Sequence, residues 1–327
     1  MTALYVTSLA EGVGRTTICS GIARHLLNNG KKIGFFKPII TVEKKEDSGS
    51  DGLFMKQVLN LDEPLDDICP VISGQDNMAS KVRKAYDKIS SGKDMVIVEG
   101  VCEQDIIEAL DAKVIVVEDY SKKSKTELGN GYQYLGEYLL GVVLNKVLPS
   151  RLDSVPMALQ FSEAGITILG VLPEDRLLFT LSVGELAEYL KGEILNGAEK
   201  SGELVENFML GAMTVDPGPE YFGRKANKAV VVKGERPDMQ MAALETSTRC
   251  IVLSGGAAPI PAVQYKAKDK NIPLIVVKSD TIATVMAIEE ALDKTRFNQV
   301  KKLTKLTEIM EKHFSFQDVY QGLGFAS

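Results

Sequence analysis

Residues 4–38, LYVTSLAEGVGRTTICSGIARHLLNNGKKIGFFKP, carry the clearest structural pattern in the chain. An apolar run at residues 4–7 leads directly into a glycine-rich segment. Apolar side chains then recur at helical spacing across residues 16–28. A second apolar run, residues 33–36, ends at Lys37-Pro38, where proline closes a strand because it has no amide donor. The pattern predicts a strand, a glycine-rich loop, a helix and a second strand.

The glycine-rich loop lies where a phosphate can bind. Glycines let the backbone curl so that successive N–H groups point inward, and the following helix adds the partial positive charge of its N-terminus. A tight turn without a ligand is the alternative, but the position between the first strand and a helix favours binding. The residues that we expect to contact a nucleotide here are Glu11, Gly12, Val13, Gly14, Arg15, Thr16 and Thr17.

Two side chains of this loop suggest specific chemistry. The Thr16 hydroxyl lies where the Ser or Thr of a P-loop ligates magnesium. Arg15 stands where a P-loop has lysine, and a planar guanidinium does not fill the same space as an ammonium. We therefore expect binding more firmly than hydrolysis.

Further short runs rich in Val, Ile and Leu lie at residues 95–98, 114–117, 140–144 and 166–171, separated by segments of helical character. Such runs are typical of parallel strands buried on both faces. The first part of the chain is therefore predicted to be a doubly wound, P-loop-type α/β domain with its ligand at the carboxyl ends of the strands. The charged, aperiodic residues 40–52 are interpreted as a loop.

A second domain is predicted after a boundary near residue 182, so that residues 1–182 and 183–327 form separate units. Strand-like runs at residues 229–232, 250–253 and 274–277 give the second part its own, smaller α/β core. Residues 300–310 show one apolar stripe and predict a C-terminal helix. Docking onto its own domain is the first interpretation of this stripe, and a dimer contact is the second.

Composition excludes several classes of function. The 327 residues are 45% hydrophobic and 25% charged, the net charge is −6, and no long Lys/Arg cluster offers a face to nucleic acid. No apolar run approaches the roughly 18 residues needed to span a bilayer, and the first residues lack a basic leader, so we expect a cytoplasmic protein. The cysteines and histidines are few and scattered: Cys19, Cys69, Cys102, Cys250, His25 and His313. They indicate no disulfide framework, no zinc site and no Ser-His-Asp triad.

Residues 6–39 resemble the start of dethiobiotin synthetase and of the similar N-terminal domain of long bacterial phosphate acetyltransferases. In the synthetase the phosphate loop ends in Gly-Lys-Thr and the second strand ends in Lys-Pro. Both landmarks are present, with Arg15 replacing the lysine. The resemblance implies ATP as nucleotide and Mg²⁺ as its metal ion. Independently of it, Lys37 lies at the carboxyl end of a strand beside the phosphate loop, where it could neutralise a transferred phosphoryl group together with Arg15 or hold an anionic substrate. A surface lysine before a proline is the alternative.

Later landmarks follow in the family's order. Residues 95–100, MVIVEG, are similar to the strand whose glutamate helps to bind magnesium, which implies that role for Glu99. Asp51 resembles the aspartate that also faces the metal, so the implied metal ligands are Thr16, Asp51 and Glu99. Residues 141–146, GVVLNK, resemble the strand whose terminal asparagine contacts adenine, here Asn145, and Pro173 and Glu174 resemble the loop beside the base. Asn145 alone does not distinguish adenine from guanine.

From about residue 183 the chain resembles the DRTGG domain that follows the synthetase-like domain in the long acetyltransferases. The similarity lies in residues 230–244 and 252–261, although Glu235 replaces the family's aspartate. Turns at residues 234–237 and 254–256 offer backbone N–H groups to a small anionic ligand, unless they are simply tight turns. The family's acetyltransferase domain is absent from the 327 residues, so acetyl transfer is not expected of them.

Three functions remain open at this point. The first is a regulatory or sensor protein that binds an ATP-type nucleotide and forms a homodimer. The second is an ATP- and Mg²⁺-dependent ligase that phosphorylates a carboxylate or carbamate. The third is an interaction module whose loop binds nothing. Whether the protein is an enzyme therefore depends on what Arg15 permits.

Overall fold

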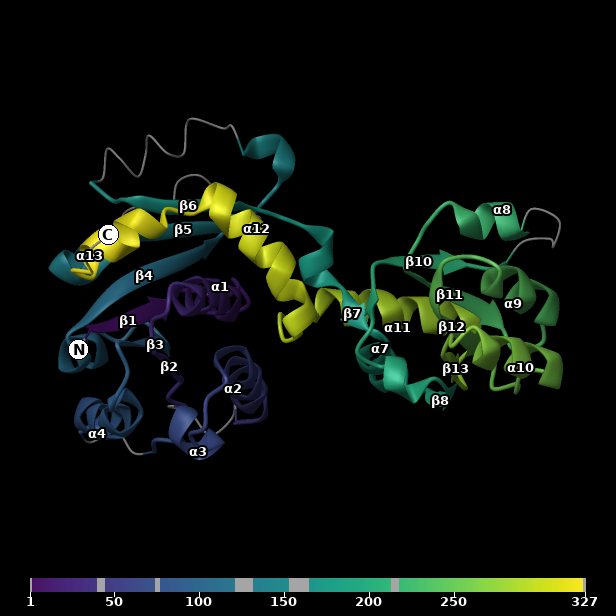
Figure 1. Ribbon diagram of the computed structural model, residues 1–327, viewed down its shortest axis with the longest axis horizontal. Coiled ribbons are helices and arrows are strands. Elements are labelled where there is room, and N and C mark those ends of the chain that lie inside the picture. Colours follow the sequence, from purple (N-terminus) through teal and green to yellow (C-terminus); the bar gives the residue numbers. More distant parts are fainter. Residues whose placement is uncertain are drawn as a thin grey trace. The chain divides into compact units, whose positions relative to one another are not determined.

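The computed structural model describes residues 2–39, 45–73, 77–120, 132–152, 165–212 and 218–325. The chain divides into two compact units, the first made of Met1–Leu178 with Phe297–Ser327 and the second of Phe179–Arg296. Each unit has its own sheet and its own apolar core. Figure 1 shows the two units, with the chain coloured from its start to its end.

The first unit is built on a sheet of six strands in the order β2-β3-β1-β4-β5-β6, and every neighbouring pair is parallel. Its strands are nearly all buried, as expected of a sheet covered on both faces. This arrangement confirms the predicted doubly wound α/β fold. The strands are β1 (Thr2–Thr7), β2 (Ile33–Phe36), β3 (Met95–Glu99), β4 (Ala112–Asp119), β5 (Leu139–Val147) and β6 (Ile168–Pro173).

The strand order places a topological switch between β1 and β4. From β1 the chain runs through α1 (Arg15–Asn28) toward β2, whereas from β4 it continues in the opposite direction toward β5. In such sheets the crevice at the carboxyl ends beside the switch is where ligands bind. The glycine-rich loop after β1 lies at this point.

Helices cover both faces of the first sheet. The helix α1 contacts α2 (Lys45–Leu59) and α12 (Leu303–His313), and α4 (Met78–Ser90) contacts α5 (Gln104–Leu110). Because right-handed crossovers in opposite directions put helices on opposite faces, these are two layers around one sheet. Short elements complete the unit: α3 (Leu65–Ile68), α13 (Phe316–Gly322), η2 (Gln133–Tyr138), η3 (Pro149–Arg151) and η6 (Val300–Lys302).

The interpretation of residues 40–52 as a loop was wrong for its second half, because α2 begins at Lys45. The residues that hold this helix in place lie in its later turns, where Phe54, Met55 and Val58 are buried. The charged first turns gave no helical pattern of their own. Residues 40–44 lie outside the described residues.

The C-terminal helix was predicted correctly, but it does not belong to the second domain. Leu306, Ile309 and Met310 on α12 are buried in the core of the first unit, where α12 contacts α1 and β6. A Cβ atom at Gly21 of α1 would collide with the Met310 sulfur, so the two helices approach closely. In Figure 1 both C-terminal helices, α12 and α13, lie beside β6, which each of them contacts. The expected domain of residues 183–327 therefore ends at Arg296, because an apolar stripe does not specify the core that it enters.

The second unit is a five-stranded sheet in the order β10-β11-β12-β13-β8, parallel except for the edge strand β8. Its three predicted strands are present as β11 (Lys228–Lys233), β12 (Thr248–Ser254) and β13 (Leu274–Val276). The remaining elements are η4 (Arg176–Phe179), which crosses the boundary, β7 (Leu181–Ser182), α7 (Val183–Tyr189), β8 (Glu193–Asn196), η5 (Ala198–Lys200), β9 (Leu204–Val205), β10 (Asn207–Leu210), α8 (Gly218–Gly223), α9 (Pro237–Leu244), α10 (Pro261–Asp269) and α11 (Thr281–Asp293).

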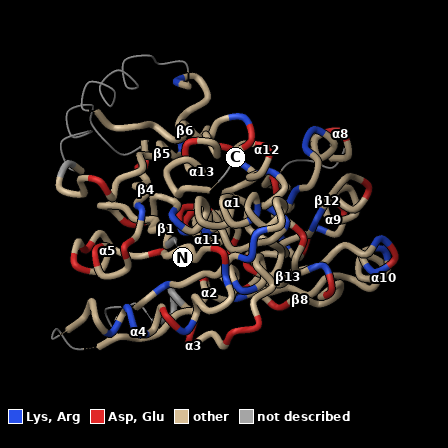
Figure 2. The backbone as a smooth tube through the Cα atoms, turned by 60° about the vertical axis from the view of Figure 1, so that its left-hand side comes forward, with Lys and Arg blue, Asp and Glu red and all other residues tan. Residues whose placement is uncertain are grey.

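Charged residues of both signs are mixed along the elements (Figure 2). At the C-terminal end of α10, for example, Lys266 and the C-cap residue Lys270 both pair with Glu245. Because surface charges of opposite sign pair locally in this way, the number of charged residues does not identify a functional ionic cluster. The burial of the charged groups does. Of the helices in the described ranges, none is long and apolar enough to cross a membrane.

Candidate functional site

The loop after β1 is curled, not extended. Gly12 and Gly14 have φ angles of 68° and 97°, in the left-handed region that favours glycine. Gly14 is the N-cap of α1, and without a side chain it cannot cap the helix itself. The amide groups at the start of α1 are therefore not covered by their own N-cap residue.

Two side chains of β5 fix the direction of the loop's peptide groups. Asn145 Nδ2 donates to Val13 O at 2.8 Å, and Lys146 Nζ donates to Gly12 O at 2.6 Å. In a planar trans peptide the N–H group points opposite to the carbonyl. The amides of Val13 and Gly14 consequently point away from β5, as a phosphate-binding loop requires.

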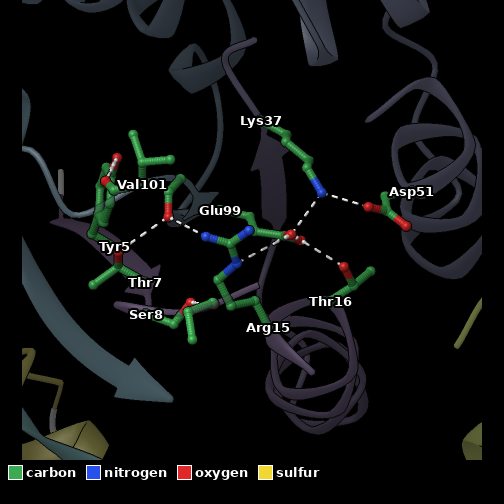
Figure 3. A network of polar contacts seen from close by, with 11 residues as sticks. Tyr5, Thr7, Ser8, Arg15, Thr16, Lys37, Asp51, Glu99 and Val101 are labelled. Atoms are coloured by element: carbon green, nitrogen blue, oxygen red, sulfur yellow. Dashed lines mark hydrogen bonds and ion pairs between the residues drawn. The ribbon is translucent and has the colours of Figure 1, made fainter. Parts of the chain in front are cut away.

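A buried ionic cluster lies beside this loop at the ends of β2 and β3 (Figure 3). The Glu99 side chain is only 2% exposed, and its Oε1 atom accepts from Lys37 Nζ at 2.6 Å and from Thr16 Oγ1 at 3.1 Å. Lys37 Nζ also donates to Asp51 Oδ2 at 2.5 Å. The fold thus brings together Thr16, Lys37, Asp51 and Glu99, which are far apart in sequence.

Arg15 faces the end of β3. Its Nη1 atom donates to Gly100 O at 3.1 Å, and its Nε atom lies 4.0 Å from Glu99 Oε1 (Figure 3). The guanidinium therefore adds a second positive charge near Glu99, in a place that the sequence did not specify.

Burial and neighbouring charge shift the pKa values of this cluster. Burial alone would lower the pKa of Lys37, but the carboxylates of Glu99 and Asp51 outweigh it and hold the pKa well above its usual range. Burial raises the pKa of the Cys19 thiol well above its usual range, and the Glu99 carboxylate adds to that shift. Lys37 is therefore a permanent cation at neutral pH, and Cys19 is not a nucleophile.

The residues suit a divalent cation. Thr16, Asp51 and Glu99 supply hydroxyl and carboxylate oxygens, the donors that Mg²⁺ prefers. Glu99 Oε2 is buried and has no hydrogen-bond partner among the described residues. Such an atom is costly unless a further group satisfies it. The Lys37 ammonium lies between the carboxylates of Asp51 and Glu99. Among the described residues, no group of three His, Cys, Asp or Glu side chains is placed to hold a metal ion without other ligands.

The residues that are expected to contact the nucleotide base lie at the ends of the neighbouring strands β5 and β6. Glu174 N donates to Val147 O at 2.7 Å, which places Pro173 and Glu174 beside β5, two residues beyond Asn145. The Asn145 amide itself holds the phosphate loop, so its contact with adenine stays a prediction. Within the loop Glu11 is exposed and Thr17 is buried.

Sequence reasoning missed Lys146, which binds Gly12 O and lies 2.9 Å from Asp119 Oδ2. Asp119 is the last residue of β4. In a regular strand Lys146 would point away from Asn145, and its left-handed backbone could not be foreseen from the sequence.

In the second unit the turn before α9 is held by its own side chains. Arg236 forms a two-point ion pair with Asp238, with Nη2 to Oδ2 at 2.7 Å and Nε to Oδ1 at 3.0 Å. Gln240 Nε2 donates to Gly234 O at 3.0 Å. At the end of β12, Gly255 and its neighbour Gly256 have positive φ angles. An anionic ligand at these turns stays a prediction.

Comparison with known proteins identifies relatives of both units. A family model described as an AAA domain matches residues 2–180, and one described as a DRTGG domain matches residues 185–291. Phosphate acetyltransferase of Nitratidesulfovibrio vulgaris is 21% identical over 359 residues, covering 97% of this chain and 51% of that protein. ATP-dependent dethiobiotin synthetase of Methanocaldococcus jannaschii is 27% identical over 114 residues, covering 30% of this chain and 51% of that protein.

Among solved structures, the CBS and DRTGG domains of the regulatory region of Clostridium perfringens pyrophosphatase, complexed with the activator diadenosine tetraphosphate, align with 42% of this chain and 64% of theirs, at 17% identity and a TM-score of 0.33. The chain spans about half the length of the curated phosphate acetyltransferases that it matches. The resemblance to the synthetase and to the acetyltransferases, noted from the sequence, is confirmed.

Proposed function

The chain belongs to the AAA domain family through residues 2–180, and on that basis we propose that its first unit binds an ATP-type nucleotide together with Mg²⁺. In this proposal nucleotide binding regulates the DRTGG domain at residues 185–291, so that the protein acts as a nucleotide sensor.

The conformation of the phosphate loop carries the proposal. Two successive carbonyls, of Gly12 and Val13, are held by donors from β5, and the amides of Val13 and Gly14 point the other way, at the N-terminus of α1. This is the arrangement that binds phosphate through backbone amides and the helix dipole.

The side chains around the loop have complementary roles in this proposal. Lys37 and Arg15 neutralise the terminal phosphate. Thr16, Asp51 and Glu99 hold Mg²⁺, which supplies positive charge to the phosphate oxygens. At the other end of the loop, Asn145, with residues 173–174, borders the base.

A ligase or synthetase is the second candidate, and the position of Lys37 favours it. A buried ammonium at the end of β2, 2.6 Å from Glu99 and next to the loop, lies where a transferred phosphoryl group or an anionic substrate needs charge stabilisation. A phosphate-release assay with ATP and Mg²⁺ separates the two candidates, because a sensor binds without turnover.

Titration calorimetry with ATP and Mg²⁺ tests the proposal. We expect saturable heat with Mg²⁺ and weaker binding when EDTA is present. Glu99→Gln should lose most of the effect of Mg²⁺ on affinity while it keeps the fold. Absence of heat at millimolar ATP would overturn nucleotide binding, and Glu99→Gln with an unchanged magnesium effect would refute the metal role of Glu99.

We further propose that the protein is a cytoplasmic homodimer and that the turns of the second unit at residues 234–237 and 254–256 bind a small anionic ligand. Sedimentation equilibrium with and without ATP measures whether the protein is a dimer. A purely monomeric protein under both conditions would exclude dimerisation as the way in which the sensor responds.

A further inference from the structure

The end of β5 departs from a regular strand at the two residues that hold the phosphate loop. The pairing of β5 with β6 shifts register between Leu144 and Val147, and Lys146 has a φ angle of 57°. Such a conformation is unfavourable for lysine and is found where the surrounding structure imposes it. Its result is that Asn145 and Lys146, which would alternate in a regular strand, both reach the same loop.

Asp119, at the end of β4, forms an ion pair with the Lys146 ammonium. Lys146 Nζ lies 2.9 Å from Asp119 Oδ2, and the Asp119 side chain is 4% exposed. A buried carboxylate holds a paired cation firmly, because separating the two charges in the protein interior is costly. The ammonium is therefore held in place by β4 while it donates to Gly12 O at 2.6 Å.

The loop is packed against the same side chains. A Cβ atom at Gly14 would collide with Asn145 Nδ2, so the loop has no free space on this side. The contacts of Asn145 and Lys146 are with successive peptide groups, at Val13 O and Gly12 O. Together they determine which way two phosphate-binding amides point.

From this geometry we infer that Asn145, Lys146 and Asp119 form a brace that holds the phosphate loop in its binding conformation, and that Lys146 is a positioning residue of the site. The inference rests on the proposed nucleotide site and deepens it. A brace acts on every ligand that uses the loop, whether or not the ligand has a base. A contact between Asn145 and adenine acts only on ligands that carry the base.

Calorimetry with two ligands, ATP and inorganic tripolyphosphate, each with Mg²⁺, distinguishes these roles. We expect Lys146→Met and Asn145→Ala to weaken the binding of both ligands by a similar factor of about 10, the loss typical of one hydrogen bond. Lys113→Met is the matched control, because Lys113, at the other end of β4, donates to Glu137 O and should leave both affinities unchanged. Weakened ATP binding with unchanged tripolyphosphate binding in both brace variants would overturn the inference.

Lys146→Gly separates the side chain from the backbone. Glycine adopts the left-handed conformation without strain, so Lys146→Gly loses the ion pair with Asp119, as Lys146→Met does, but relieves the backbone at this position. We expect it to bind both ligands as weakly as Lys146→Met does. Wild-type affinities in Lys146→Gly would show that the ammonium does not hold the loop.

Hydrogen exchange without any ligand tests the brace independently of nucleotide binding. The Ile18 amide, which donates to Gly14 O at 3.1 Å, should exchange faster in Lys146→Gly and Asn145→Ala than in the wild type, and at the wild-type rate in Lys113→Met. If the wild type bound neither ATP nor tripolyphosphate, the proposed function would fail, and this exchange measurement would still decide on the brace. Unchanged exchange in both brace variants would refute it.

Discussion

Gly12 and Gly14 both have positive φ angles, but only one of them is packed against another side chain. A Cβ atom at Gly14 would meet Asn145 Nδ2, whereas a Cβ atom at Gly12 would have nothing within 4 Å. The backbone cost of alanine is similar at both positions, about 1 kcal/mol. Only at Gly14 does a collision with the brace add to it.

This difference gives a matched pair of variants. Gly12→Ala should lower the free energy of unfolding by about 1 kcal/mol, and Gly14→Ala by about 2–3 kcal/mol, with the larger loss of ATP affinity also in Gly14→Ala. Denaturant unfolding and calorimetry measure the two effects. Equal losses in both variants would contradict the role assigned to the contact between Gly14 and Asn145.

Arg15 offers a second test at the level of one side chain. Its guanidinium bonds to Gly100 O, outside the loop. A lysine here could follow the phosphates, so under the sensor proposal Arg15→Lys should raise the rate of phosphate release from ATP. Under the ligase alternative the same change should be neutral or harmful. A phosphate-release assay on both proteins, with Glu99→Gln as a background control, provides the comparison.

The sequence was sufficient to predict most residues of the site, but it was insufficient to predict how these residues contact one another. Thr16, Lys37, Asp51 and Glu99 follow recognisable strand ends or a loop, and the structure brings them together. The direction of Arg15 depends on the carbonyl of Gly100, which only the folded sheet supplies. The role of Lys146 depends on a backbone irregularity that follows from the register of two strands.

Among the elements, α1 is the one on which the packing of the C-terminal segment depends. Gly21 admits Met310 of α12, and one turn further on the ring of His25 stacks on Phe316 of α13, with centroids 3.6 Å apart. Tyr320 lies beside the same ring. The neutral imidazole is therefore part of an aromatic contact between helices.

The pKa of His25 makes this contact sensitive to pH. Burial lowers the pKa of His25 below its ordinary value of 6.5, and Glu311 opposes part of this shift. Below about pH 6.5 the unfolded chain takes up the proton first, so folding stability is lost as the pH falls toward the folded pKa. We expect the melting temperature of the wild type to fall more than that of His25→Phe between about pH 7.5 and pH 5.5. A constant difference between the two proteins would contradict this assignment.

At this scale the sequence predicted the long elements and missed the short ones. Buried runs such as residues 114–117 and 250–253 are strands in the structure, because a parallel sheet needs uninterrupted apolar residues. The two-residue strands β7 and β9 and the edge strands β8 and β10 carry no such pattern, since they are partly exposed or too short. Their pairing arises from tertiary contacts.

The whole molecule is not two domains in tandem. The second unit, Phe179–Arg296, is inserted between the main part of the first unit and its C-terminal helices. The first unit therefore needs residues from both sides of the insertion, including Leu306 and Met310 in its core.

Two deletions test this organisation. Removal of residues 297–327 should destabilise the first unit by several kcal/mol, because several buried apolar side chains of α12 are lost together. Replacement of residues 179–296 by a flexible linker of about 10 residues should keep the first unit folded and able to bind ATP. Thermal unfolding and calorimetry on both proteins give the readout. A fully stable protein without residues 297–327 would contradict the division of the chain.

The insertion also sets an order of events on the ribosome. The six strands of the first sheet and all of the second unit are translated before α12, which covers part of the first core. Once residues 179–296 have left the ribosome, the second unit is ready to fold while the first unit still has an uncovered apolar face. We expect such intermediates to be bound by chaperones until residues 297–327 emerge.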